Sequence, residues 1–438
     1  MAEEAVDGAA LLAALQEAPS VGVRLNPAKP EPLPEWLENA EAVPWAPGAF
    51  YLDKRPEFTL EPTLHAGAFY VQDPSSAVYS AVVGRLAGDT PVKLLDSCAA
   101  PGGKTTAAIG ALPQGSVVVA NEAMRPRASV LAENIVKWGN PDVIVTSSFL
   151  DRMTPVGSLF DIIIADAPCS GEGMMRKDET ARTQWTPGLV ESCAALQREI
   201  LDSLIPILRP GGHLIFSTCT FSRAENEDNV HRLMDLYGLE SVDMELEKLG
   251  VPRGWSDRAF CYRFMPHLTR GEGLFLSVLR KPEAGDVTSP RKVKAPKVKT
   301  VKGLPDWLAD SSRYVPVETG NSVRMLSKDT HSLLGRLKDA RIPVIQAGVE
   351  LGSPKGRDFI PAHALALSTA LRPDAFPDVA LDRDQALDYL RRNPITLPDG
   401  TPRGFVTVSY AGRRLGFMKN IGSRANSLYP QAWRIRNL

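Results

Sequence analysis

The chain has 438 residues, of which 44% are hydrophobic and 23% are charged, and its formal net charge is −1. This length predicts two to four domains, and the composition is that of an ordinary globular protein. The sequence shows no disulfide framework, no apolar stretch near the roughly 20 residues of a membrane span and no signal peptide, so we expect a cytoplasmic protein that binds no membrane. We expect this protein to be a monomer.

Residues 1–90 form a Pro-rich segment of mixed character. The run Leu11–Leu15 indicates a helix, and the run Val21–Asn26 indicates a strand. We expect this N-terminal segment to stand apart from the regular pattern that follows it.

Residues 91–281 alternate between short apolar runs and helical stretches, which is typical of a doubly wound α/β domain. The runs are rich in β-branched residues and are bounded by Pro and Gly, as buried strands of a parallel sheet are. In such a sheet, the chemistry gathers outside the carboxyl ends of the strands. The expected strands are Val92–Asp96, Ser116–Glu122, Asp142–Thr146, Asp161–Asp166, His213–Thr218 and Gly273–Arg280.

A glycine-rich turn, Cys98–Thr105, lies between the first strand and the helix expected after it. Glycines let the backbone approach a ligand closely, and a helix N-terminus offers free N–H groups to a carboxylate. The turn matches neither the dinucleotide motif G-x-G-x-x-G nor the spacing of a P-loop. The next strand ends at Glu122, which suits bonding to ribose hydroxyls or, alternatively, is an acid stabilised by a helix N-terminus. The turn and the acid together fit an adenosine ligand without a pyrophosphate, a description that S-adenosylmethionine meets.

Two cysteines follow two further strands. Cys169 stands in Asp166-Ala167-Pro168-Cys169-Ser170, and Cys219 stands in Ser217-Thr218-Cys219-Thr220. Although they are far apart in the sequence, both would open onto one crevice at the strand ends. A thiolate is suited to attack a weak electrophile such as C6 of a pyrimidine. The alternative is a pair of buried structural cysteines, but two thiols at strand ends beside the glycine-rich turn favour a reactive pair.

The remainder of the chain divides into three parts. Residues 282–302 are rich in Pro and Lys and predict a basic linker, which is either a plain tether or a contact for RNA. Residues 303–375 are expected to form a first C-terminal domain, and residues 376–438 a small β-rich module. Residues 391–438 carry nine Lys or Arg against one acid, a charge of +8 that favours contact with a nucleic acid.

The motifs Asp96–Thr105, Asp166–Gly171 and Ser217–Thr220, in this order, resemble those of the Nop/Sun family of RNA cytosine-C5 methyltransferases. The segment His65–Ser76 and the ending Asn426–Pro430 resemble the bacterial branch that acts on small-subunit ribosomal RNA, so the resemblance covers nearly the whole chain. It implies a Rossmann-like, S-adenosylmethionine-dependent methyltransferase core, an N-terminal RNA-binding segment and a C-terminal PUA-like RNA-binding module. It also implies 5-methylcytosine as the product, ribosomal RNA or the small ribosomal subunit as the partner, and no metal.

The resemblance implies roles for individual residues. Cys219 would be the nucleophile, Cys169 would assist its release, and Asp166 would contact both the cofactor and the target base. Lys104 would lower the pKa of a nearby thiol or orient Asp166, unless it only packs over the turn. The adenine-side acid of the family has no clear counterpart, and Asp151 is the candidate with Ser148 as the alternative. The residues implied to line the cofactor site are Cys98, Ala99, Ala100, Pro101, Gly102, Gly103, Lys104, Glu122, Asp151 and Asp166.

The chemistry explains why such a reaction needs a thiolate. C5 of cytosine is a poor nucleophile, and addition of a thiolate at C6 makes C5 enamine-like, so that methyl transfer can follow. The target base must first leave its stack, and Arg176 and Trp185 either hold it or are ordinary loop residues.

Two other functions stay open. A methyltransferase of exocyclic amino groups would carry D-P-P-Y or N-P-P-Y where this chain has D-A-P-C. An RNA-binding protein that no longer turns over would not need both Cys169 and Cys219. The sequence thus favours the cytosine-C5 enzyme.

Overall fold

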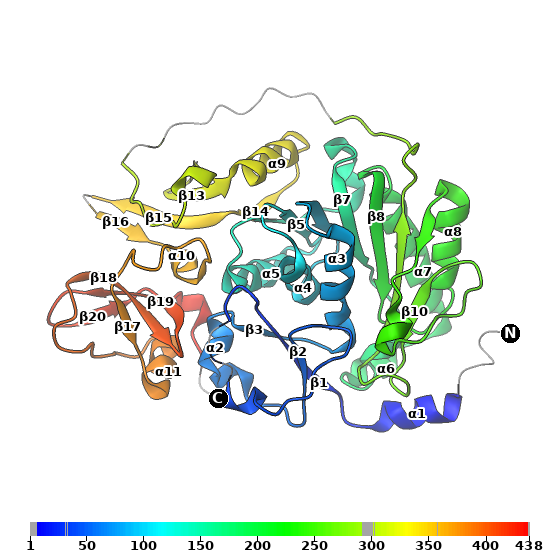
Figure 1. Ribbon diagram of the computed structural model, residues 1–438, viewed down its shortest axis with the longest axis horizontal. Coiled ribbons are helices and arrows are strands. Elements are labelled where there is room, and N and C mark those ends of the chain that lie inside the picture. Colours follow the sequence, from blue (N-terminus) through cyan, green and yellow to red (C-terminus); the bar gives the residue numbers. More distant parts are fainter. Residues whose placement is uncertain are drawn as a thin grey trace.

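The computed structural model of the chain describes residues 7–30, 32, 34–290, 301, 303–356 and 358–436. Figure 1 shows a central sheet flanked by helices, with the blue N-terminal segment and the yellow-to-red C-terminal part beside it. Half of the expected linker, residues 291–300 and 302, lies outside the described residues. In the described part of the chain, no helix combines the length and apolar character needed to cross a membrane.

The central sheet forms because its short apolar runs are buried on both faces. The strand order is β10-β11-β8-β7-β4-β5-β6-β14, and β9 pairs with β11 outside this path. Strands β8, β7, β4, β5 and β6 are parallel, whereas β9, β10, β11 and β14 pair antiparallel with their neighbours. The bounds are β4 (Lys93–Asp96), β5 (Val117–Asn121), β6 (Val143–Thr146), β7 (Phe160–Asp166), β8 (Leu208–Thr218), β9 (Glu240–Val242), β10 (Cys261–Phe264), β11 (Leu274–Arg280) and β14 (Val344–Ala347).

All six strands expected from the sequence are confirmed, with ends shifted by a residue or so except in β8, which begins earlier at Leu208. It begins there because Leu208 already pairs with Phe160 of β7. The sixth expected strand, β11, runs antiparallel to β8, so the sheet is parallel only in its centre.

Helices cover both faces of the sheet. Ala107 of α4 and Leu131 of α5 belong to the core cluster on one face, and Leu201 of α7, Leu233 of α8 and Leu337 of α9 belong to the cluster on the other. These faces are the apolar stripes of amphipathic helices, which must be buried against the sheet. The bounds are α3 (Tyr79–Ala87), α4 (Gly103–Ala111), α5 (Arg125–Trp138), η5 (Leu150–Val156), η6 (Glu172–Met174), α6 (Glu179–Gln184), α7 (Pro187–Leu204), α8 (Glu227–Tyr237), η7 (Leu246–Leu249) and α9 (Lys328–Asp339).

The sheet continues beyond the expected linker. β14 pairs antiparallel with β6, and α9 packs into the same core cluster as α7 and α8. Residues 303–375 therefore share a sheet and a core with residues 91–281. The same segment also forms an antiparallel sheet of order β12-β13-β15-β16. Its further elements are η8 (Ser311–Arg313), β12 (Tyr314–Thr319), β13 (Ser322–Ser327), β15 (Val349–Lys355), β16 (Asp358–Pro361) and α10 (His363–Leu367).

The N-terminal segment holds the expected helix and strand and docks on the core. Arg24 of β1 is 2% exposed and donates from Nη2 to Thr106 Oγ1 of α4 over 2.7 Å. Asn26 Nδ2 donates to the carbonyl of Trp138, where α5 ends, over 2.9 Å. The elements are α1 (Gly8–Gln16), β1 (Val21–Leu25), η2 (Glu35–Leu37), β2 (Ala49–Leu52), η3 (Phe58–Leu60), α2 (Pro62–His65), β3 (Phe69–Val71) and η4 (Ser75–Val78), with sheet order β2-β1-β3.

The C-terminal module is β-rich, as expected. Its sheet has the order β17-β18-β19-β20, with one parallel pair, β17 and β18. Ala66 of the N-terminal segment packs into the apolar cluster of this module, and Phe417 of the module packs with Leu365 of α10. The module is thus joined to both neighbouring parts. Its elements are β17 (Asp378–Ala380), α11 (Arg383–Arg391), β18 (Gly404–Tyr410), β19 (Arg413–Asn420), β20 (Ala425–Ser427) and η9 (Gln431–Trp433).

Candidate active site

Three parallel strands bring the sequence motifs to one edge of the sheet. β4 ends at Asp96, β7 ends at Asp166 and β8 ends at Thr218. β4 lies between β5 and β7, so the strand order reverses beside it. Ligands of open α/β sheets bind at such a switch point, outside the carboxyl ends of the strands. The expected cofactor turn and both expected cysteine loops start at this edge.

The turn between β4 and α4 depends on glycine. Gly102 has a φ of +115°, and a Cβ there would lie 3.2 Å from Leu131 Cδ1, so a larger residue would be strained. The backbone N–H of Ala99 donates to the carbonyl of Asn121 over 2.8 Å, which holds the turn against β5. No side chain caps the N-terminus of α4, so its first N–H groups are left for water or a ligand.

Asp96 leaves one buried oxygen without a partner. Thr105 Oγ1 donates to Asp96 Oδ2 over 2.6 Å, but Oδ1 has no hydrogen-bond partner within the described residues. Burial raises the pKa of Asp96 to about 7, although the bond from Thr105 opposes the shift. A buried orphan acceptor calls for an explanation, and a donor on a ligand would satisfy it.

Lys104 and Asp166 form an ion pair across the crevice. Lys104 Nζ donates to Asp166 Oδ2 over 2.6 Å, and both side chains are partly buried. Burial lowers the pKa of Lys104, but the charge of Asp166 and the hydrogen bond to it raise the pKa more, so the net shift is upward. The sequence left three roles open for Lys104: lowering the pKa of a thiol, orienting Asp166 or packing over the turn. The structure shows that Lys104 contacts Asp166 directly.

Asp166 has a second partner that sequence reasoning missed. Ser217 Oγ donates to Asp166 Oδ1 over 2.7 Å, and Tyr79 Oη donates in turn to Ser217 Oγ over 2.5 Å. Tyr79 belongs to α3 and is distant in the sequence, so no motif or spacing could have indicated this chain of hydrogen bonds. Both oxygens of Asp166 therefore accept from the protein.

The two expected cysteines meet. The Sγ atoms of Cys169 and Cys219 lie 3.0 Å apart, and the N–H of Cys219 donates to Cys169 Sγ over 3.3 Å. Both residues are half-buried. The hydrogen bond to Cys219, together with burial, raises the pKa of the Cys169 thiol well above its usual range. The Cys169 thiol therefore stays protonated near neutral pH.

Cys98 lies in the cofactor turn and takes no part in the contact between Cys169 and Cys219. Burial raises the pKa of its thiol to about 12, so the thiol stays protonated near neutral pH. A thiol that stays protonated fits the lining role expected for Cys98.

Glu122 lies directly after β5 and is buried. Its Oε1 accepts from the N–H of Met124 over 3.0 Å, and its Oε2 lies 3.4 Å from Arg127 Nη1. These contacts, at the start of α5, are those expected if Glu122 is an acid that stabilises a helix N-terminus. A carboxylate has about four acceptor positions, so ribose hydroxyls could still bind beside them.

The structure leaves both candidates for the adenine-side position, Asp151 and Ser148, open. Asp151 lies in the first turn of η5 and is exposed, whereas Ser148 is buried and its hydroxyl donates to the carbonyl of Phe149 over 3.0 Å. Between them, Phe149 is 58% exposed. An aromatic face beside the ends of β5 and β6 is a surface on which a base can stack. In the sequence, the one signal for Phe149 is its position next to Asp151, the acid expected at this place.

The sequence left two readings of Arg176 open, a base contact or an ordinary loop residue, and the structure shows its contacts within the protein. It forms a buried ion pair with Glu272 (2.8 Å) and donates to the carbonyls of Gly271 and Ala14. Its guanidinium therefore ties α1 and the loop before β11 together. Trp185, at the end of α6, is half-buried, and its Nε1 has no partner among the described residues.

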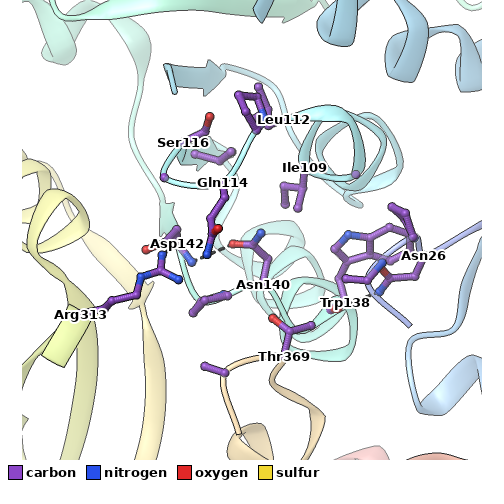
Figure 2. Close-up of a pocket in the computed structure, with 18 of the residues that line it drawn as sticks. Asn26, Ile109, Leu112, Gln114, Ser116, Trp138, Asn140, Asp142, Arg313 and Thr369 are labelled. Carbon is purple, nitrogen blue, oxygen red and sulfur yellow. Dashed lines mark hydrogen bonds and ion pairs between the residues drawn. The ribbon is translucent and has the colours of Figure 1, made fainter. Parts of the chain in front are cut away.

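A cavity of about 650 Å³ lies at the opposite edge of the sheet (Figure 2). Ser116 and Asp142, which precede β5 and β6, contribute to its lining, together with Trp138, Asn140 and Arg313. The amino ends of the strands are not where an α/β sheet carries its chemistry. This cavity therefore does not belong to the candidate active site.

Known families match three parts of the chain. Residues 85–280 match the model described as 16S rRNA methyltransferase RsmB/F, residues 3–74 match the N-terminal domain of 16S rRNA methyltransferase RsmF, and residues 376–435 match the methyltransferase RsmF PUA domain. Together they span the expected N-terminal segment, the sheet with its motifs and the β-rich module.

Individual proteins agree with these matches. The ribosomal RNA small subunit methyltransferase F of Cronobacter sakazakii is 31% identical over 414 residues, covering 89% of this chain and 83% of the relative. The protein of that name from Escherichia coli is 30% identical over 415 residues, with 89% and 84% covered. A solved methyltransferase homologue from Pyrococcus horikoshii is 25% identical, has a TM-score of 0.54 and covers 62% of this chain and 90% of its own.

Proposed function

The chain belongs to the RsmB/F family of 16S rRNA methyltransferases, and from this premise we propose that it methylates C5 of a cytosine in 16S rRNA through a covalent bond between Cys219 and C6. The observation that carries the proposal is the contact of Cys169 with Cys219 at the crevice that the Lys104–Asp166 pair spans. The membership makes the chain an S-adenosylmethionine-dependent enzyme with a methyltransferase core, an RsmF-type N-terminal domain and a PUA domain.

The crevice between β4 and β7 suits S-adenosylmethionine. The orphan oxygen of Asp96 would accept from the ammonium group, and the uncapped N–H groups of α4 would bind the carboxylate. Glu122 would accept from the ribose hydroxyls, and Phe149 would flank the adenine beside Asp151. The residues expected from the sequence, Cys98 to Lys104, line the turn between these points. When bound there, the cofactor supplies an electrophilic methyl group.

Cys219 makes the first bond. Its thiolate adds to C6 of the flipped cytosine, which moves electron density to C5 and N3 of the ring. Asp166 accepts from the exocyclic amino group, since its oxygens already act as acceptors, and protonated Lys104 offsets the charge that grows at N3. C5 then attacks the methyl group.

Cys169 serves the last step. The proton on C5 passes to water, its electron pair forms the C5–C6 double bond, and the C6–S bond breaks to return Cys219 as a thiolate. The protonated Cys169 sulfur, 3.0 Å from that of Cys219, stabilises the leaving thiolate by a hydrogen bond. This role agrees with the pKa of Cys169, which keeps the donor proton in place.

The C-terminal module is proposed to bind the RNA backbone. A cavity of about 650 Å³ on it is lined by Arg392, Arg403 and Arg424 with a single acid, Asp399. Cationic side chains that face a groove attract phosphates without reading sequence. We also propose that the enzyme acts on ribosomal RNA in the cytoplasm, and the expected monomer stays a prediction that sedimentation would test.

The test is to map modified cytosines in 16S rRNA from cells with and without the protein. A 5-methylcytosine that vanishes with the gene and returns with the wild-type protein, but not with Cys219→Ala, supports the proposal. Loss of an N4-methylcytosine instead would favour the exocyclic alternative, and unchanged rRNA would favour an RNA-binding protein without turnover.

A further inference from the structure

One fully buried carboxylate contacts both cysteine loops. Glu225 lies in the loop between Cys219 and α8, and its exposed fraction is 0%. The sequence motifs did not single it out, and the mechanism described above leaves it unused.

On the Cys169 side, Glu225 holds the residue next to the thiol. The backbone N–H of Ser170 donates to Glu225 Oε2 over 3.0 Å, and Ser170 Oγ donates to Oε1 over 2.5 Å. Gln197 Nε2 of α7 donates to the same Oε2 over 2.9 Å and also to the carbonyl of Pro168 over 2.9 Å. The residues on both sides of Cys169 are thus fixed through one carboxylate and one amide.

On the Cys219 side, the contact is to Thr220. Thr220 Oγ1 lies 3.3 Å from Glu225 Oε1 and 2.9 Å from Ser170 Oγ. The residues that follow the two cysteines therefore meet on the same oxygen. Glu172 stabilises this arrangement further, because its Oε2 accepts a hydrogen bond from Thr220 Oγ1 over 2.8 Å.

The carboxylate is costly at this place, which argues against an incidental role. Burial raises the pKa of Glu225, although the hydrogen bonds from Ser170 and Gln197 lower it. Among the described residues, no cationic side chain forms an ion pair with it. A buried, unpaired acid persists where its hydrogen bonds fix a geometry that an apolar residue could not fix.

We propose that Glu225 is a positioning residue that clamps the loops of Cys169 and Cys219 so that the two sulfurs stay in hydrogen-bond contact while the covalent adduct is released. The inference rests on the proposed function, because it assigns Glu225 to the release step of that reaction. Glu225 acts through Ser170 and Thr220 and contacts neither base nor cofactor. Loss of the clamp should therefore slow release more than it slows attack.

The experiment compares Glu225→Gln with Cys169→Ala on small ribosomal subunits from cells that lack the protein. Glutamine keeps the size but replaces one acceptor oxygen with an N–H₂ group facing the donors of Ser170 and Gln197. We expect turnover to fall at least tenfold and a protein–RNA adduct to build up on denaturing gels, with S-adenosylmethionine affinity unchanged. Addition of Cys219→Ala should abolish the adduct. Because the effect lies in release, kcat should fall more than KM rises.

Two further variants keep the test decisive. Thr330→Ala removes a buried hydroxyl that donates to Asp142, far from the cysteines, and should lose stability without accumulating adduct. Ser170→Ala cuts the clamp with Glu225 in place, and it should trap adduct even if Glu225→Gln does not fold.

The outcomes separate this inference from the proposed function. If Cys169→Ala traps an adduct but folded Glu225→Gln and Ser170→Ala do not, or if both turn over normally, the clamp is wrong and the mechanism stands. If Cys169→Ala itself traps nothing, the release role of Cys169 fails, and the clamp fails with it.

Discussion

Lys104 Nζ and Asp166 Oδ2 lie 2.6 Å apart, which joins the turn after β4 directly to the end of β7. This pair spans the crevice where the cofactor turn and the cysteine loops meet. A residue of the turn thereby fixes the acid proposed to face the target base.

Replacement of Lys104 by methionine should disable the reaction with little change in fold. The variant loses a charge-assisted hydrogen bond worth about 1.5–3 kcal/mol, so we expect kcat/KM to fall about 10- to 150-fold. Lys248→Met, in an exposed ion pair with Glu245, is the matched control. Equal activities of the two variants would show that Lys104 only packs over the turn.

Replacement of Cys219 by alanine should abolish methyl transfer while S-adenosylmethionine still binds. The thiol is the proposed nucleophile, and it lies outside the turn of Cys98 to Lys104. Methyl transfer from labelled cofactor to small subunits and calorimetric binding measure the two properties. More than a few per cent of residual turnover would exclude Cys219 as the nucleophile.

Replacement of Glu122 by alanine should weaken cofactor binding. Two charge-assisted hydrogen bonds to ribose are at stake, each worth about 1.5–3 kcal/mol. Calorimetry should show a rise in Kd of at least tenfold, whereas Glu133→Ala within α5, where the acid pairs with Lys137, should show none. An unchanged Kd for Glu122→Ala would leave this residue as a stabiliser of the helix N-terminus.

Cofactor affinity should depend on pH through Asp96. Its pKa is raised to about 7 by burial, so the carboxyl becomes neutral below that pH and attracts an ammonium less. We expect Kd for S-adenosylmethionine to rise as pH falls from 8 to 6, and Asp96→Asn to flatten this profile.

The same residue should affect stability with the opposite sign. Because the pKa in the folded state lies above the ordinary value of 3.8, Asp96 favours folding most below pH 3.8, and this contribution is lost as pH rises through about 7. Asp96→Asn should therefore gain stability relative to wild type between pH 5 and 8 without cofactor. The denaturant midpoints of both proteins, measured at pH 5 and at pH 8, test this expectation. A difference between the two midpoints that is the same at both pH values would contradict it.

Removal of charge from the C-terminal groove should weaken RNA binding in a salt-dependent way. Arg403 and Arg424 line the groove, and both are exposed. Each phosphate contact contributes about 0.7 to 0.9 to the slope of log affinity against log salt, so the double glutamine variant should lower the slope by 1 to 2. The matched control replaces Arg209 and Arg258, two exposed arginines of the methyltransferase domain, by glutamine and should leave the salt slope unchanged. Identical slopes would move the RNA contact to another surface.

The motifs were predictable because each sits directly after a short apolar strand, and parallel strands bring their ends together whatever the distance in sequence. The partners of those motifs were not. Tyr79 reaches Asp166 through Ser217 from α3, and Glu225 reaches Ser170 from a loop, contacts that only packing decides. The buried ion pair of Arg176 could not be predicted for a related reason, because its partner Glu272 is remote in the sequence.

The pairing of β14 with β6 has a consequence for how the molecule is made. β6 ends at Thr146 and its edge partner starts at Val344, so a ribosome adding about 5–20 residues per second delivers the partner roughly 10–40 s later. During that time β6 is an open edge strand, able to pair with other chains. The nascent enzyme therefore passes through a period of exposure to aggregation, which ends only when the strand beyond the basic segment arrives.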